Sequence, residues 1–387
     1  MKSSIIYLLL IISFFSCSDK KNIAQYKLEE TTEQIIIPID SNTKLFSRSM
    51  HHFTDTTGIE YLTIENTETT DSYYYINFYR LDSCVLSHRV KIEKEGPNGI
   101  PRMMGHGVID LDHIFISAFN RPLIYQINKQ GIITNKYDFS KTDDGLITTG
   151  TDFNSLIYKP LVIQNHKIFC MQYPMPPNCD GEQLKKTPLT VTIDTISKEV
   201  KASKLCYPEL WSKGDGMGLN PHCSRIFDGK RFIYAFRMSH DLLVTEDHIK
   251  GESITAKSQY IDDLQTEGFS NKLSFSEFNK LASEQACYGN IIYDPYKNIY
   301  YRFVYPKCNI DSMDPEYIFC RKEFSIMILD ENFNVLGETL FPAGKYIPAL
   351  FFVNEKGLFL SVNNTSNPQM TDDKLVFQCL HPVANSK

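Results

Sequence analysis

The stretch "IIYDPYKNIYYRF", residues 291–303, carries the pattern that decides the fold. Apolar residues lead into a turn that begins at Asp294, and alternating apolar residues follow the turn. Asp and Asn side chains bond the local backbone and tolerate unusual dihedral angles, so this pattern predicts a β-hairpin. Five more segments repeat it: "HHFTDTTGIEYLTI" (51–64), "GVIDLDHIFIS" (107–117), "LVIQNHKIFCM" (161–171), "RIFDGKRFIYAF" (225–236) and "FFVNEKGLFLSV" (351–362).

A second and weaker set of strand–turn–strand segments lies between these hairpins. The segments turn near Asp82, Asn128, Asp194, Glu246 and Asp330. Two hairpins per repeat form a four-stranded antiparallel sheet, and six such sheets arranged radially form a β-propeller. Two β-sandwich domains are the alternative, but they do not explain six similar hairpins. We therefore expect an all-β, six-bladed propeller.

The two ends of the chain complement each other in this fold. The last repeat lacks a fourth strand after "KLVFQCL" (374–380), whereas "EQIIIPID" (33–40) is a strand without a hairpin of its own. The N-terminal strand is therefore predicted to close the ring, with the propeller spanning residues 33–387.

One segment departs from the β pattern: "SFSEFNKLASEQA" (274–286) predicts a short helix before the fifth blade, capped by Ser274 or Ser276.

The N-terminus has the parts of an export signal. Lys2 is followed by the apolar run Ile5–Phe15 and by the small residue Ser16. This run is too short to span a bilayer, which takes about 20 residues. The segment resembles a bacterial lipoprotein signal, which implies a signal peptide over residues 1–16 and a lipid on Cys17 that anchors the protein to a membrane. A buried first helix is the alternative.

Residues 17–32 are polar, and we expect them to form a lipidated tether. Ser18 after the anchor favours the outer membrane, since Asp at that position commonly signals retention in the inner membrane. Lys20 and Lys21 interrupt the acidic run that surface-exposed lipoproteins usually carry there. We therefore expect the periplasmic face of the outer membrane rather than the cell surface.

Charge and cysteine usage narrow the possible partners and cofactors. The formal net charge is −6 without a basic tract, which argues against nucleic acid as a partner. Cys206, His222 and Cys223 lack the spacing of a closed zinc site, so we expect neither a metal nor another cofactor. Two disulfides are possible, Cys308 with Cys320 and Cys170 with Cys179, although scattered buried thiols are an equally good interpretation.

The whole chain resembles a family of Bacteroidetes lipoproteins of unknown function with a six-bladed propeller fold. The resemblance rests on the signal with Cys17, on "EGPNGIPRMMGHG" (95–107), on "LIYQINKQGII" (123–133) and on "YGNIIYDPYKNIYYRF" (288–303). The "GPNGI" segment is also similar to the Gly-Pro connector of NHL-type propellers. These motifs imply fold and envelope location but no chemistry.

Function is expected on the propeller face that bears the connectors between blades and the loops between second and third strands. Candidate ligand-binding residues on this face are Arg102, His106, Arg121, Tyr158, His222, Arg237, His240, Tyr288 and Tyr305. Further polar and aromatic residues there are Asn120, Lys159, Tyr173, Trp211, Asn290 and Lys345. The set suits an anionic or glycan-like ligand. The alternative is that these residues simply line a wet channel; His51 and His52 are expected to be wall residues.

No catalytic motif stands out. Neither GxSxG nor HExxH occurs, and "CDGEQ" and "KGDGMG" lack the acidic spacing of a calcium loop. The sequence therefore favours a non-catalytic binding or scaffolding protein of the envelope, which recognises a glycan, a peptide or an envelope partner. The alternative is a propeller hydrolase or lyase that acts on an anionic polysaccharide, with a His, Tyr and Arg cluster for proton transfer.

Overall fold

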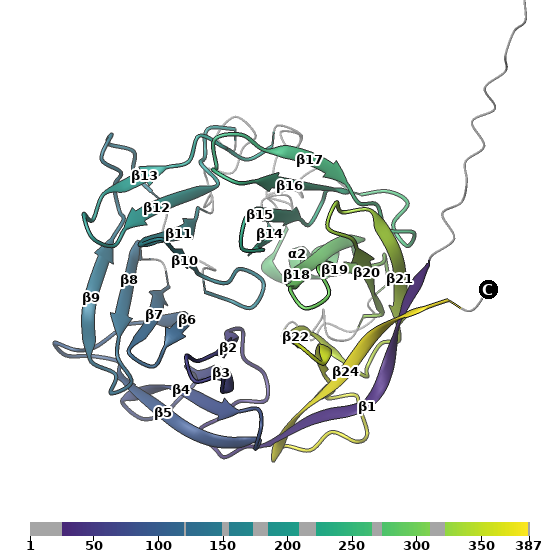
Figure 1. The fold of residues 1–387 in the computed structure, drawn as a ribbon, viewed down its shortest axis with the longest axis horizontal. Coiled ribbons are helices and arrows are strands. Elements are labelled where there is room, and N and C mark those ends of the chain that lie inside the picture. The colour runs from purple at the N-terminus through teal and green to yellow at the C-terminus, as the bar shows by residue number, and fades with distance from the viewer. Residues whose placement is uncertain are drawn as a thin grey trace, which may run out of the picture.

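The computed structural model describes residues 25–119, 121–148, 155–172, 185–208, 222–264, 273–309 and 322–385. These residues form an all-β, propeller-like fold in which sheets follow one another around a ring (Figure 1). The predicted signal peptide, Cys17, Asn120, Tyr173, Cys179, Trp211 and Cys320 lie outside the described residues.

Four separate sheets have four antiparallel strands each, in chain order. The first sheet contains β2 (Met50–Thr54), β3 (Glu60–Asn66), β4 (Tyr73–Arg80) and β5 (Val85–Glu93). The second sheet contains β6 (Met103–Asp110), β7 (His113–Ala118), β8 (Leu123–Ile127) and β9 (Ile133–Asp138). The third sheet contains β10 (Val162–Gln164), β11 (Lys167–Met171), β12 (Thr190–Asp194) and β13 (Val200–Ala202). The fourth sheet contains β14 (Cys223–Phe227), β15 (Phe232–Phe236), β16 (Asp241–Thr245) and β17 (Glu252–Thr255).

The remaining strands form one eight-stranded sheet with the order β18-β19-β20-β21-β1-β24-β23-β22. Its strands are β1 (Tyr26–Pro38), β18 (Cys287–Asp294), β19 (Ile299–Tyr305), β20 (Phe324–Leu329), β21 (Val335–Phe341), β22 (Ile347–Asn354), β23 (Gly357–Ser361) and β24 (Lys374–Ala384). Its two halves meet where β1 and β21 pair in parallel at Tyr26 and Gly337. A Cβ atom on Gly337 would lie 1.8 Å from the Tyr26 carbonyl oxygen, so this approach requires glycine.

The N-terminal strand is longer than the sequence predicted. β1 pairs with β24 from Tyr26↔Ala384 to Pro38↔Lys374, with an irregularity between Glu30 and Gln34. The strand begins at Tyr26 and not at residue 33, so residues 26–32 belong to the sheet rather than to the tether. Backbone pairing accounts for the difference, because Leu28 is the only residue of this stretch that is buried.

The predicted hairpins are confirmed in both sets. In the first set, Asp55, Asp110, Asn165, Asp228, Asp294 and Asn354 each follow or end an innermost strand. Their side chains stabilise the turns by accepting hydrogen bonds from the backbone. The Oδ1 atom of Asp228 accepts hydrogen bonds from the backbone N–H groups of Lys230 and Arg231. The Oδ1 atom of Asp294 accepts hydrogen bonds from the backbone N–H groups of Tyr296 and Lys297.

Six apolar clusters hold neighbouring groups of strands together. Phe78 and Ile114 belong to the cluster between the first and second sheets, and Ile233 and Tyr300 to the cluster between the fourth sheet and β18–β21. The ring therefore derives its cohesion from face-to-face packing of adjacent sheets, which removes apolar side chains from water.

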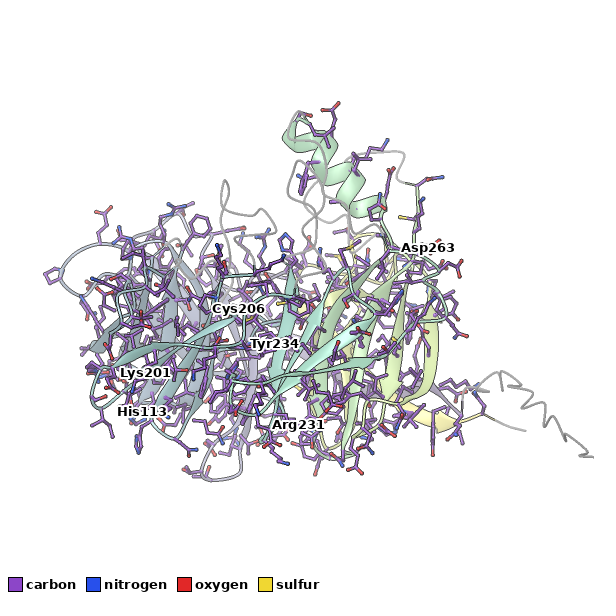
Figure 2. All side chains as sticks on the ribbon, turned by 90° about the horizontal axis from the view of Figure 1, so that it is seen from above. His113, Lys201, Cys206, Arg231, Tyr234 and Asp263 are labelled. Carbon is purple, nitrogen blue, oxygen red and sulfur yellow. The ribbon has the colours of Figure 1, made fainter. Side chains whose placement is uncertain are left out.

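The described residues contain one α-helix, α2 (Phe275–Glu284), which stands above one face of the ring (Figure 2). Its position confirms the predicted helical segment. Ser274 is the N-cap and forms a capping box with Glu277. Arg231 and His113, beside first-hairpin turns, lie toward the opposite face (Figure 2). Among the described residues there is no helix with the length and apolarity needed to cross a membrane.

Candidate functional site

A pocket of about 570 Å³ opens on the face that carries the connections between sheets, and we call it the connector pocket. Five stretches of the chain build it: the segment before β2, the end of β3 with the residues that follow, the start of β6, the start of β22, and the loop between β23 and β24. Its lining residues are Lys44, Leu45, Phe46, Ser47, Arg48, Glu65, Asn66, Thr67, Glu68, Met103, Met104, Ile347, Asn363, Asn364, Thr365, Met370 and Asp372.

One side of the connector pocket is apolar and adaptable. Met103 is buried, whereas Leu45, Phe46, Met104 and Met370 are half-buried. Methionine is unbranched and polarisable, so it can fit irregular apolar ligand surfaces. The pocket is therefore suited to apolar side chains of a partner more than to sugar rings, which favour flat aromatic platforms.

The charged groups of the pocket differ in how they are paired. Lys44 Nζ lies 3.2 Å from Glu68 Oε2, so these two charges offset each other. Arg48 is exposed, and within the described residues its guanidinium makes no hydrogen bond or ion pair. Arg48 is thus a cation available to an anionic group at the edge of the apolar wall.

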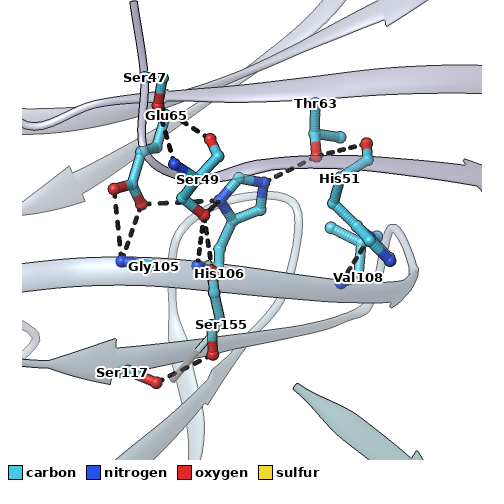
Figure 3. Close-up of polar contacts among 10 residues, drawn as sticks. All are labelled: Ser47, Ser49, His51, Thr63, Glu65, Gly105, His106, Val108, Ser117 and Ser155. Carbon is cyan, nitrogen blue, oxygen red and sulfur yellow. Dashed lines mark hydrogen bonds and ion pairs between the residues drawn. The ribbon is translucent and has the colours of Figure 1, made fainter. Parts of the chain in front are cut away.

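Glu65 forms part of the inner wall, where its side chain is 5% exposed. Its Oε2 atom accepts a hydrogen bond from the backbone N–H of Gly105 at 3.0 Å and lies 3.6 Å from His106 Nδ1. His106 lies behind Glu65 in a cluster of hydroxyl groups (Figure 3). Its Nδ1 atom is 2.8 Å from Ser49 Oγ, and its Nε2 atom is 2.7 Å from Thr63 Oγ1.

The hydroxyl groups of this cluster hold the His106 ring in position. Ser49 Oγ donates to the Ser155 carbonyl at 2.9 Å, and Thr63 Oγ1 donates to the His51 carbonyl at 3.0 Å. Ser49 and Thr63 therefore hold both ring nitrogens of His106, and Glu65 Oε2 lies next to Nδ1. Among the residues that line the pocket, Arg48 is the cation whose guanidinium makes no ion pair with a described residue, and Asp372 adds an acidic side chain to the same lining.

The structure places the predicted site residues in separate environments. His106 is 2% exposed, Tyr288 0% and Tyr305 3%, so none of these three side chains faces solvent. Arg102 and Arg121 are exposed, and the Arg102 guanidinium lies 4.4 Å from the centre of the Phe119 ring.

His240 and Tyr288 come together between the fourth sheet and β18. His240 Nδ1 lies 2.7 Å from the Tyr288 hydroxyl, which also accepts the Ser258 N–H at 3.0 Å. The guanidinium of fully buried Arg302 lies 3.5 Å from the centre of the Tyr288 ring. Burial, followed by the charges of Lys257 and Arg302, lowers the pKa of His240. This group joins two parts of the ring.

His222 and Arg237 form another group with Lys159. Burial lowers the pKa of His222 well below its usual range, and the charges of Arg237 and Lys159 add to this effect. Burial likewise lowers the pKa of Lys159, which is 2% exposed. Tyr158 precedes Lys159, and its carbonyl accepts from Ser224 Oγ and from the Arg225 N–H.

Sequence reasoning missed the residues that line the connector pocket. None of the nine predicted binding residues is among them, although Met103 follows Arg102 directly. The segment Leu45–Arg48 and the loop residues Asn363–Asp372 carry no motif, and only the fold brings them together. The neighbouring apolar and basic residues in "LFSR" (45–48) are the one local signal that could have indicated a binding surface.

Cys170 and Cys308 are free thiols in the structure. Their predicted partners, Cys179 and Cys320, lie outside the described residues, so the two disulfides remain predictions. Burial raises the pKa of Cys170 to about 12, which keeps this thiol protonated and unreactive at neutral pH. Within the described ranges, no three His, Cys, Asp or Glu side chains are grouped so that they could hold a metal ion.

Comparison with known proteins identifies the family of this chain. The model of a domain of unknown function, DUF4221, matches residues 25–340. The chain belongs to this family. A crystal structure of a DUF4221 member from Bacteroides vulgatus is 29% identical, with a TM-score of 0.84; the match covers 94% of this chain and 99% of that one. The predicted resemblance to a family of unknown function is thereby confirmed, and no curated protein matches this DUF4221 chain.

More distant solved structures share only general features with the DUF4221 chain. Hydrazine synthase from Kuenenia stuttgartiensis is 9% identical with a TM-score of 0.41, and the match covers 84% of this chain and 76% of that one. Virginiamycin B lyase from Staphylococcus aureus is 10% identical with a TM-score of 0.38, with 92% and 100% covered. Scores this low carry no functional argument.

Proposed function

We propose that this DUF4221 protein is a non-catalytic binding protein of the cell envelope that recognises a peptide segment at the connector pocket. The observation that carries the proposal is the combination of an adaptable methionine-rich wall with an Arg48 guanidinium that makes no hydrogen bond or ion pair with a described residue. Apolar anchors fill such a wall, and a guanidinium pairs well with a carboxylate. The ligand is therefore a peptide with apolar side chains next to an acidic group or a C-terminal carboxylate.

The scaffold in this proposal is a six-bladed propeller, with β1 as the outer strand of the last blade. One observation supports counting β18–β21 as one blade and β22–β24 with β1 as another. The ladder between β1 and β21 is short, with one residue pair in register, Tyr26 with Gly337. Six apolar clusters between successive groups of strands also support this count. A ring closed by both chain ends would give the pocket a rigid frame.

The proposed location is the periplasmic face of the outer membrane, with a lipid on Cys17 as the anchor. The support is the sequence before and after Cys17, including Lys20 and Lys21 in place of an acidic run. A tether from Cys17 to Tyr26 would hold the propeller close to the membrane. Envelope proteins would then be the accessible source of the peptide.

The alternative, a hydrolase or lyase, would need a group that can exchange a proton with substrate. Ser49, His106 and Glu65 lie together as such a group would, but Ser49 is 0% exposed and both His106 nitrogens are already bonded. A catalytic base needs hydrogen-bond reach to the proton it removes. The enclosed position of this cluster therefore favours binding over catalysis.

A display library of random decapeptides with free C-terminal carboxylates tests the proposal, with the chain from residue 18 onward as bait. Labelled copies of the enriched peptides are then titrated by fluorescence anisotropy against Met104→Arg, Arg48→Glu and the control Ile196→Arg, whose site is 72% exposed at the β12–β13 turn. We expect both pocket variants to bind at least about tenfold more weakly, since a charge is buried or reversed, and the control to bind as wild type. Peptides that bind all four proteins equally, or an array of anionic oligosaccharides that binds when no peptide does, would refute peptide recognition.

A further inference from the structure

A second cavity, of about 510 Å³, lies around the ring axis on the side of the first-hairpin turns, and we call it the axial cavity. Innermost strands from five positions line it, namely β2, β10, β14, β18 and β22. It shares no lining residue with the connector pocket. This volume lies within the range of sites for small organic molecules.

The wall of the axial cavity is mostly apolar, and its polar residues are His51, His52, Thr54, Tyr293 and Tyr296. Leu161, Ile163, Phe227 and Ile292 line it, and each is half-buried. The described lining residues include no Lys, Arg, Asp or Glu. Since a charge buried without a partner costs several kcal/mol, this wall disfavours an ionised ligand and favours a neutral apolar one.

Ile157 forms part of the inner end of the cavity. It lies in the segment that leads into β10 and enters the middle of the ring (Figure 1). The Ile157 N–H donates to the Arg48 carbonyl at 3.2 Å, and the Tyr158 carbonyl accepts from Ser224 Oγ at 2.7 Å. Because the segment before β2 and strand β14 hold these residues from two sides, the inner end of the cavity is fixed in place.

One hydrogen-bond donor in the cavity has a fixed orientation. His51 Nδ1 accepts the backbone N–H of Val108 at 3.2 Å, so the proton of the neutral ring resides on Nε2 (Figure 3). Among the described residues no acceptor bonds Nε2, and His51 lines the cavity and is half-buried. Burial, together with the nearby His106 and His52, lowers the pKa of His51 to about 3, so the ring is neutral at physiological pH.

We propose that the axial cavity binds a neutral apolar small molecule that carries one hydrogen-bond acceptor, such as a carbonyl oxygen, bonded to His51 Nε2–H. The apolar wall supplies most of the affinity by removing ligand surface from water. The His51 donor orients the ligand and selects for an acceptor, as the few polar groups of small-molecule sites do. This site is independent of the peptide site and lies toward the opposite face.

The neutral fluorophore prodan, a naphthalene with a propionyl carbonyl, is a direct probe. With the chain from residue 18 onward, we expect a blue shift of its emission that saturates as protein is added. His51→Phe keeps an apolar ring but removes the donor, so prodan should bind about tenfold more weakly. Ile163→Trp should abolish the shift by filling the cavity, whereas the control Ile196→Trp, at an exposed turn, should leave it unchanged.

Several results would overturn the inference. The wild-type chain could fail to shift prodan emission, or prodan could bind Ile163→Trp as tightly as wild type. Equal binding of wild type and a circular-dichroism-verified His51→Phe variant would remove His51 from the site. An anionic naphthalenesulfonate that competes with prodan at equal affinity would contradict the preference for a neutral ligand.

Discussion

Replacing Arg302 by Met tests how neighbouring parts of the ring are held together. Arg302 is fully buried in β19, and its guanidinium donates to three backbone carbonyls outside its own sheet. The acceptors are Ser239 at 2.7 Å, His240 at 2.8 Å and Ala256 at 2.9 Å. Arg302→Met keeps an apolar stem of similar length but leaves the Ser239 and Ala256 carbonyls without a donor, whereas the His240 carbonyl still accepts the Ala256 N–H at 3.0 Å.

Two opposing contributions determine how much the substitution changes the free energy of unfolding. Leaving a buried acceptor unpaired costs about 2 kcal/mol, and losing one of two hydrogen bonds at the His240 carbonyl costs about 1 kcal/mol, so the three losses together cost about 5 kcal/mol. Burial lowers the pKa of Arg302 to about 10 from an ordinary 12.5, which corresponds to about 3 kcal/mol of penalty on the charged form. Removing the charge recovers that penalty. We therefore expect Arg302→Met to lower the free energy of unfolding by about 2 kcal/mol.

Equilibrium unfolding in urea, followed by tyrosine fluorescence and circular dichroism, measures the effect. Arg80→Met is the matched control, because Arg80 is partly exposed and, in the part of the chain that the structure describes, pairs only with Asp82 two residues away. Its unfolding midpoint should equal that of wild type, since exposed ion pairs add little. If Arg302→Met unfolds within about 1 kcal/mol of wild type, the carbonyls have other partners and the reasoning fails.

Two further predictions concern the N-terminal region. Cys17→Ala should move the protein from the membrane fraction to the soluble fraction of cells and abolish incorporation of radiolabelled fatty acid; unchanged partitioning would contradict the anchor. Deleting residues 26–38 should cause aggregation in size-exclusion chromatography and a much lower melting temperature, because the edge of β24 and the cover over Phe377 are lost, whereas deleting residues 18–24 should not. Equal stability of the two truncations would refute the role of β1.

The hairpins and the helix could be predicted from sequence because each depends on local chemistry. Asp294 organises its turn with its own side chain, and Ser274 and Glu277 cap α2 within one turn of helix. The first half of β1 could not be predicted in this way. Residues 26–32 bury little apolar surface, and they are strand because their backbone pairs with β24 at the far end of the chain.

The candidate site was harder to predict than the hairpins, because the sequence analysis predicted ligand-binding residues from their residue type. His106, Tyr288 and Tyr305 carry groups common in binding sites, but the packing of adjacent sheets encloses them. Conversely, the segments that contain Arg48 and Met370 carry no motif. These two residues line the same pocket because the first and last sheets are neighbours in the ring. Long-range proximity of this kind leaves no periodic trace in the sequence.

Cationic residues in this fold can donate hydrogen bonds to backbone carbonyls of a neighbouring sheet, and residues used in this way are not available to a ligand. Adjacent sheets meet face to face, so the carbonyls of one connector approach the next sheet and need donors there. Arg225 donates to the carbonyls of Pro160 and Phe169 across the third and fourth sheets, much as Arg302 does one interface further on. Arg225 and Arg302 are thus paired within the protein, whereas Arg48 stands at the edge of an apolar wall without a protein acceptor among the described residues. The proposed peptide site therefore rests on a cation without a protein acceptor, and not on the density of His, Tyr and Arg.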